Sequence, residues 1–306
     1  MKVEVITPRD DRQWHKLRGQ DVTASVAGAL FGVHPFTTLA SLWAEKSKLL
    51  PPRLDQDSPA MMRGRYLEPV AVQILRDRHP EWTIEHNAAE NRYYRSPEHR
   101  IGATPDVIVD CPTRGVGIIQ IKSVAEDAYR AKWCTEDAVE PPLWIAIQAS
   151  IEAKLVGASW AAVAPLVVGF GLTMPELEVE LHDGLWANIT KRTAAFWKGV
   201  EDGTRPELDL IADAETVDAI YRHGDDEEVA DLTQDGEILE LIGQRHDAVA
   251  AAKEAAANKL RAETAIKAKL GHATLAILAG GRRATWRRQK TAHGHSRVLR
   301  LPKMEN

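Results

Sequence analysis

The sequence predicts an α/β (α+β) fold in which helices flank one mixed β-sheet. Between Trp82 and Lys122 the chain consists of short segments rich in β-branched and aromatic residues, separated by turn residues. Helix-like and strand-like segments then alternate to about residue 203. Before Trp82, apolar residues recur at helical spacing, as in Leu67, Val70, Ala71, Ile74 and Leu75. This order of elements is typical of a sheet covered by helices.

The first fifty residues are predicted to be helical. One helix is expected over residues 11–32 and a second over residues 37–50, with a turn at His34–Pro35 between them. Thr37 or Thr38 can cap the second helix, and Pro51–Pro52 end it.

A third helix is expected over residues 60–80, and its geometry places Glu68 at the edge of the apolar stripe. Three or four strands follow it, in the segments WTIEHN, RYYRS, ATPDVIVD and VGIIQIKS, with a hairpin between Val109 and Gly117. Helices are then predicted at 124–134, 141–157 and 184–203, and strands at 160–172 and 176–182.

The composition changes after residue 205. We therefore divide the chain into a domain over residues 1–205 and an extension over 206–306. Residues 201–240 carry fifteen acids. A long Ala-rich helix is expected over 237–270, with a stripe suited to a helical hairpin or a partner chain, and two short strands follow it. Residues 282–300 carry seven Lys and Arg and no acid, which is compatible with phosphate binding on one face.

The charge, the length of the apolar runs and the cysteine count limit the class of protein. The net charge is −5, and no run of about 18 apolar residues predicts a membrane span. The first residues show no secretory signal, and Cys111 and Cys134 are too few for a four-cysteine metal cluster. We expect a reduced, cytoplasmic setting. The histidines, among them His86, show no metal-ligand spacing and are expected at the surface.

The hairpin carries a candidate metal site. Gln120 and Lys122 are two residues apart on one strand, so both side chains point to the same face, where Asp106 can join them. A carboxylate, an amide oxygen and the Ile121 carbonyl suit Mg²⁺ or Mn²⁺, with Glu68 as a further carboxylate. Such an ion polarises a scissile phosphate and acidifies a bound water, which Lys122 can orient.

These residues resemble the PD-(D/E)XK nuclease signature, with TPD at 104–106 and QIK at 120–122. Three further blocks resemble the YqaJ-like viral recombinase family, which includes lambda exonuclease. They are WHKLRGQDVTAS, GRYLEPVAVQIL and IQASIEAKLVGA, in the order found in that family and spread over about residues 14–200. The tail also resembles the extension of many phage members.

The resemblance implies a phage or prophage 5′-to-3′ double-strand exonuclease that prepares DNA ends for recombination by strand annealing in a bacterial cytoplasm. It implies a PD-(D/E)XK core, binding of the terminal 5′-phosphate by Arg18, Ser25 and Thr104, and a supporting role for Gln148 on the DNA-binding side. It also implies duplex DNA ends and a single-strand annealing protein as partners, and a ring of three subunits.

Gln120 departs from the family pattern, which usually has glutamate there. An amide ligates a cation without neutralising it, so a second metal is harder to hold. Two alternatives stay open. One is a structure-selective or nicking endonuclease on the same fold, and the other is a DNA-binding or assembly protein whose nuclease site has decayed at Gln120.

Overall fold

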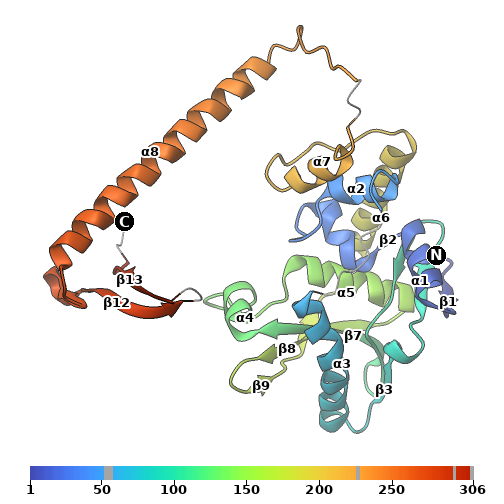
Figure 1. Cartoon of the computed structure of the whole chain (residues 1–306). Helices are drawn as coiled ribbons and strands as arrows, with labels where there is room; N and C mark the ends of the chain where they lie inside the picture. The colour runs from blue at the N-terminus through green and yellow to red at the C-terminus, as the bar shows by residue number, and fades with distance from the viewer. Residues whose placement is uncertain (52–57, 225–227, 292–293, 304–306) are drawn as a thin grey trace. The chain divides into compact units, whose positions relative to one another are not determined.

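The computed structural model describes residues 1–51, 58–224, 228–291 and 294–303. The chain divides into two compact units, Met1–Gly224 and Asp225–Asn306 (Figure 1). The composition placed the boundary at residue 205, but helix α7 (Ala214–Ile220) belongs to the first unit. There Asp213, just before α7, accepts a hydrogen bond from Thr38 at the start of helix α2.

The expected mixed sheet, flanked by helices, is confirmed in the first unit. Its six strands have the order β10-β8-β7-β6-β3, with β9 paired to β8, and only β7 and β8 run parallel. The strands are β3 (Thr83–His86), β6 (Val107–Cys111), β7 (Gly115–Ala125), β8 (Trp160–Val168), β9 (Leu172–Thr173) and β10 (Leu177–Val179). The predicted hairpin is present, with Val109 opposite Gly117.

A second, smaller sheet lies in the same unit and was not predicted as separate. It has the order β1-β4-β5-β2, made of β1 (Glu4–Ile6), β2 (Val22–Thr23), β4 (Tyr93–Ser96) and β5 (Ile101–Ala103). The segment RYYRS was therefore correctly predicted as a strand, β4, but it pairs outside the central sheet.

Two helices cover opposite faces of the central sheet (Figure 1). Ile119 and Ile121 of β7 pack with α3 (Pro59–Arg78), whereas Ile118 packs with α5 (Leu143–Val156). The alternation of a strand therefore turns Gln120 and Lys122 toward α5. The other helices of this unit are α1 (Asp11–Gln20), η1 (Ala24–Phe31), α2 (Leu39–Lys46), η2 (Asn87–Ala89), α4 (Glu126–Lys132), α6 (Asp183–Glu201) and α7.

The predicted helix over residues 11–32 is wrong in its second half. The α-helix ends at Gln20 because Asp21 is fully buried and accepts hydrogen bonds from Tyr93 and Arg95 at 2.8–3.0 Å. The chain continues as β2 and the 3₁₀ helix η1, in which a Cβ on Gly28 would lie 2.7 Å from Trp144 Cβ. The second predicted helix is confirmed as α2, capped by Thr38.

The second unit contains the long helix and an antiparallel sheet. Helix α8 (Ile238–Leu270) buries Leu270 alone among its described residues. The sheet has the order β11-β12-β13, from β11 (Leu275–Ile277), β12 (Arg283–Thr291) and β13 (Gly294–Arg300), with η3 (Ala279–Gly281) before β12. The two predicted tail strands are thus β12 and β13, and β11 was not predicted. In the described ranges, no helix combines the length and apolarity that crossing a bilayer requires.

Candidate metal centre

Asp106 and Gln120 meet where the β6–β7 hairpin opens. Val107 pairs with Ile119, so Asp106, one residue before β6, lies beside Gln120. One carboxylate oxygen of Asp106 accepts a hydrogen bond from the Gln120 side-chain nitrogen. The same oxygen accepts a second hydrogen bond, of 2.8 Å, from the Ile121 backbone N–H. The same Gln120 nitrogen donates to the Ile121 carbonyl at 3.3 Å. A carboxylate and a carbonyl oxygen therefore converge on one positively polarised group.

The oxygen of the Gln120 amide is buried and has no hydrogen-bond partner among the described residues. A buried acceptor without a partner is costly, by about 1–3 kcal/mol. Turning the amide by 180° would exchange its oxygen and nitrogen and bring a third oxygen beside Asp106 and the Ile121 carbonyl. Three converging oxygens of these types fit a hard divalent cation such as Mg²⁺.

Helix α5 contributes a buried pair to the same side of β7. Gln148 donates a hydrogen bond to Glu152 at 2.9 Å, and both side chains are buried. One oxygen of each remains without a partner among the described residues. Burial, and then the charge of Asp106, raise the pKa of Glu152 well above its ordinary value, while Lys122 opposes the shift. Burial therefore disfavours the charged form of Glu152.

The sequence did not single out Glu152. The signal was an acid on an otherwise apolar helix, four residues after Gln148 and so on the same helical face. Gln148, which the resemblance placed on the DNA-binding side, is only 5 % exposed and forms this buried pair with Glu152.

Helix α3 brings Glu68 to the other side of Asp106. Glu68 Oε1 lies 2.7 Å from His86 Nε2 on β3, and the two side chains are 27 % and 20 % exposed. The histidine was expected at the surface; it is instead a partly buried partner that fixes the Glu68 carboxylate. A hydrogen-bonded partner of this kind orients a metal-binding carboxylate.

The surroundings of Asp106 set its protonation. Burial, and then the charge of Glu68, raise the pKa of Asp106 to about 7, against the opposing effects of Lys122 and of the hydrogen bonds from Ile121 and Gln120. Lys122 itself lies with its Nζ 5.7 Å from the centre of the Trp144 ring. Asp106 is thus poised to lose a proton when a cation binds.

This pKa predicts a pH-dependent stability in the metal-free protein. A carboxyl whose pKa is higher in the folded protein stabilises the fold fully at pH values below its pKa in the unfolded chain, 3.8. That contribution is lost as the pH rises through the pKa in the folded protein, about 7. In chelator, Asp106→Asn should therefore gain stability relative to the natural protein between pH 4 and 8, by on the order of a few kcal/mol. Denaturant unfolding at several pH values measures this. A constant difference across the range would contradict the buried, titrating carboxyl.

The ligand set differs from the usual cluster of charged groups. Within the described ranges, no three His, Cys, Asp or Glu side chains are arranged to hold a metal ion. The fit to a cation therefore depends on the Gln120 amide and the Ile121 carbonyl together with Asp106, and Glu68 supplies negative charge nearby. Asp106, Gln120 and the Ile121 carbonyl are linked by hydrogen bonds, and the charges of Glu68 and Lys122 act on Asp106.

A second cluster joins the residues expected to bind a 5′-phosphate. Arg18 donates to Ser25 Oγ at 3.4 Å, and its guanidinium lies over the Trp14 ring, 4.3 Å from the centre. The indole N–H of Trp14 donates to Thr104 Oγ1 at 3.1 Å. Trp14 was not predicted as part of the site. It connects Arg18 to Thr104, two residues before Asp106.

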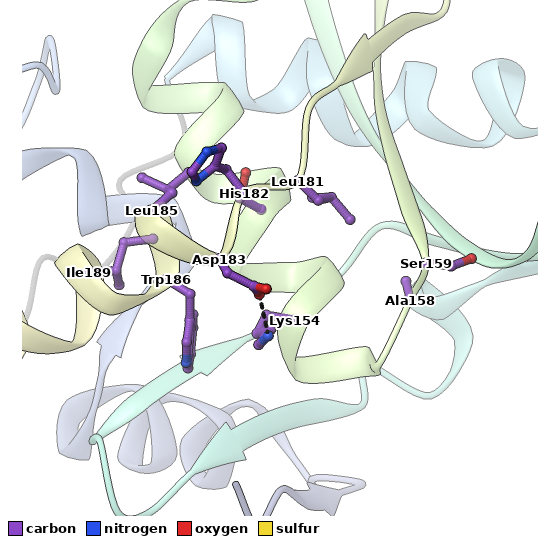
Figure 2. A pocket seen from close by; sticks show the side chains of 10 residues that line it. Lys154, Ala158, Ser159, Leu181, His182, Asp183, Leu185, Trp186 and Ile189 are labelled. Atoms are coloured by element: carbon purple, nitrogen blue, oxygen red, sulfur yellow. Dashed lines mark hydrogen bonds and ion pairs between the residues drawn. The ribbon is translucent and has the colours of Figure 1, made fainter.

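A cavity of about 210 Å³ lies elsewhere, between α5 and the start of α6 (Figure 2). Lys154 and Asp183 form an ion pair at 3.3 Å in its wall, and Ser150 lines it as well. None of the predicted site residues borders this cavity. Ser150 thus points away from the metal centre, although it shares α5 with Gln148.

Comparisons with known proteins found one family model that matches part of the first unit. Residues 13–152 match the YqaJ-like viral recombinase domain. No curated protein matches the sequence. Similar structures include an alkaline exonuclease from Laribacter hongkongensis, at 20% identity and a TM-score of 0.46, covering 67% of this chain and 99% of that one. Another is a phage-related exonuclease from Haemophilus somnus 129PT, at 14% identity and a TM-score of 0.44, covering 60% of this chain and 94% of that one.

Proposed function

We propose that the chain, whose residues 13–152 match the YqaJ-like viral recombinase domain, is a Mg²⁺-dependent deoxyribonuclease. Its substrate would be duplex DNA with a free end, degraded from 5′ to 3′. The observation that carries the proposal is the convergence of Asp106, the Gln120 amide and the Ile121 carbonyl, with a buried amide oxygen left without a partner among the described residues.

In this proposal, Asp106, Gln120 and the Ile121 carbonyl hold the cation, and Glu68 adds a carboxylate directly or through water. A bound Mg²⁺ would polarise the scissile phosphate and lower the pKa of a coordinated water. Lys122 acts beside Asp106, where its ammonium orients the attacking water or offsets developing negative charge. Glu152, whose pKa is raised by burial and by the charge of Asp106, supports the buried side of the centre through Gln148.

The Arg18 cluster would position the substrate. Arg18 and the hydroxyls of Ser25 and Thr104 supply donors for a terminal phosphate, and Trp14 keeps the guanidinium in place. Thr104 is two residues from Asp106 in the sequence. A terminal phosphate bound by Thr104 would therefore lie close to the scissile phosphodiester bond at the metal centre. The product would be a 3′ single strand, suited to an annealing partner in a bacterial cytoplasm. Mn²⁺ would substitute for Mg²⁺, and a ring of three subunits would favour processive digestion.

Digestion time courses with Mg²⁺ test the proposal. Linear duplex with 5′-phosphates should be degraded faster than the same duplex with 5′-hydroxyls, and covalently closed circles should stay intact. Arg18→Gln should reduce the preference for 5′-phosphate by about 10- to 100-fold, since a hydrogen bond to a charged group contributes about 1.5–3 kcal/mol.

The matched control is Arg12→Gln, which removes an exposed arginine from the same helix, α1. It should keep the natural preference. Cleavage of closed circles would instead favour an endonuclease, and an equal effect of both substitutions would remove Arg18 from phosphate binding.

A further inference from the structure

The sheet of the second unit concentrates positive charge. From Thr264 to Met304 the sequence has ten Lys and Arg and no Asp or Glu. The part of helix α8 before Thr264 mixes both signs, with acids such as Glu240, Asp247 and Glu254 among its bases. The excess of bases therefore belongs to the last turn of α8 and to residues 282–303, and it is a local feature of a chain with a net charge of −5.

Three arginines form a cluster on one face of this sheet. Arg283 and Arg287 are four residues apart on β12 and so point to the same face. Arg300 on β13 pairs with Thr285, midway between them. Diagonal neighbours of this kind lie about 7–8 Å apart. We call Arg283, Arg287 and Arg300 the arginine cluster; all three are exposed.

The arginine cluster has no counter-charge among the described residues. Within those ranges, none of the three guanidinium groups forms an ion pair or a side-chain hydrogen bond. Like charges this close destabilise a sheet unless an anion lies between them. Guanidinium groups are also the side chains best matched to phosphate oxygens.

On the opposite face of the same sheet, Arg297 has a structural role. Arg297 lies over the Trp286 ring at 3.7 Å and donates to the carbonyls of Trp286, Gly271 and Ala273 at 2.6–3.0 Å. Those contacts tie the sheet to the end of α8. They also cover the ring of Trp286, the only Phe, Trp or Tyr from Thr264 to Met304.

This arrangement favours duplex DNA over a single strand. Single-strand binders stack bases on exposed aromatic side chains, and the one aromatic ring here is occupied by Arg297. On one face of the antiparallel strands β12 and β13, the arginines can together contact the closely spaced phosphates of a duplex backbone. Contacts from arginine to phosphate require no base sequence.

We propose that the arginine cluster of β12 and β13 is a second DNA-binding surface, which holds the phosphate backbone of duplex DNA independently of the metal centre. The choice of DNA rests on the proposed function. The surface would keep the enzyme on its substrate between cleavage events, by binding that does not depend on base sequence.

Binding of the full chain to a closed dumbbell duplex, which has no 5′ end for the Arg18 cluster, tests this. The measurements are made in chelator on the Asp106→Asn background, with the salt concentration varied. Replacing the three arginines together by glutamine should weaken binding about tenfold or more. It should also lower the slope of log K against log [salt] by about 3, roughly one for each phosphate that an arginine no longer neutralises.

Two further variants keep the test decisive. One variant changes to glutamine three bases of α8, Arg245, Lys253 and Lys259. It removes the same charge from outside the sheet and should leave the slope unchanged. Replacing the arginine cluster by lysine keeps the charge and should retain most of the salt dependence, and thermal unfolding checks that each variant is folded.

An unchanged slope in the glutamine variant, an equal weakening of binding in the α8 control, or tighter binding of single-stranded than of duplex DNA would each overturn the proposal. Because no cleavage is measured, these outcomes are separate from failure of the nuclease assignment, which is read from digestion by the natural protein.

Discussion

Asp106→Asn is expected to abolish DNA cleavage while the protein stays folded. The substitution keeps the size of the side chain and an acceptor for the Ile121 N–H and the Gln120 amide. It removes the negative charge that would hold a divalent cation between Asp106 and the Ile121 carbonyl. Loss of a charge at the reacting centre costs on the order of 10³-fold in rate.

The measurement is the initial rate of digestion of 5′-phosphorylated linear duplex with Mg²⁺ and, separately, with Mn²⁺. Asp110→Asn is the matched control, because Asp110 is exposed on β6, four residues from Asp106. It should digest DNA at the natural rate. If Asp106→Asn cleaves as fast as Asp110→Asn with either ion, the metal centre is not where the reaction occurs.

Gln120→Glu is expected to have opposite effects with and without metal. Gln120 is 2 % exposed, and its nitrogen donates to Asp106. A glutamate would put a second carboxylate against the first, so the metal-free protein should lose roughly 3 kcal/mol of stability at pH 8. With a cation present the added charge becomes a ligand, and cleavage should reach its maximum at a lower Mg²⁺ concentration.

Urea unfolding in chelator and Mg²⁺ titration of the cleavage rate measure the two effects. Gln73→Glu serves as the control, because Gln73 bonds Asp77 at 2.7 Å on the exposed side of α3. It should change neither quantity by much. A natural protein that is inert with every divalent ion, together with an active Gln120→Glu variant, would replace the enzyme assignment by a DNA-binding protein with a decayed site.

The sequence predicted the parts of the site that depend on strand geometry. The two-residue period of β7 places Gln120 and Lys122 on one face, and the hairpin register brings Asp106 beside Gln120. Helical spacing likewise brought Glu68 to the edge of α3. These relations follow from local backbone geometry, which the spacing of apolar residues in the sequence indicates directly.

The parts that were missed depend on tertiary packing. Glu152 lies on α5, whose residues are mostly buried, so no amphipathic pattern marks the side that meets Asp106. The buried Asp21 ends the first helix through Tyr93 and Arg95, which are more than seventy residues away in the sequence. The contact between His86 and Glu68 also joins a strand to a helix, and neither element's own pattern indicates it.

The most direct test of the metal centre is the position of Mn²⁺ in crystals of the natural protein, located by anomalous scattering. We expect a bound ion coordinated by the Asp106 carboxylate, the Ile121 carbonyl and the Gln120 amide oxygen, with the amide turned relative to its metal-free orientation, and no such ion in Asp106→Asn. An ion bound elsewhere, or a Gln120 nitrogen still donating to Asp106 at saturating Mn²⁺, would contradict this expectation.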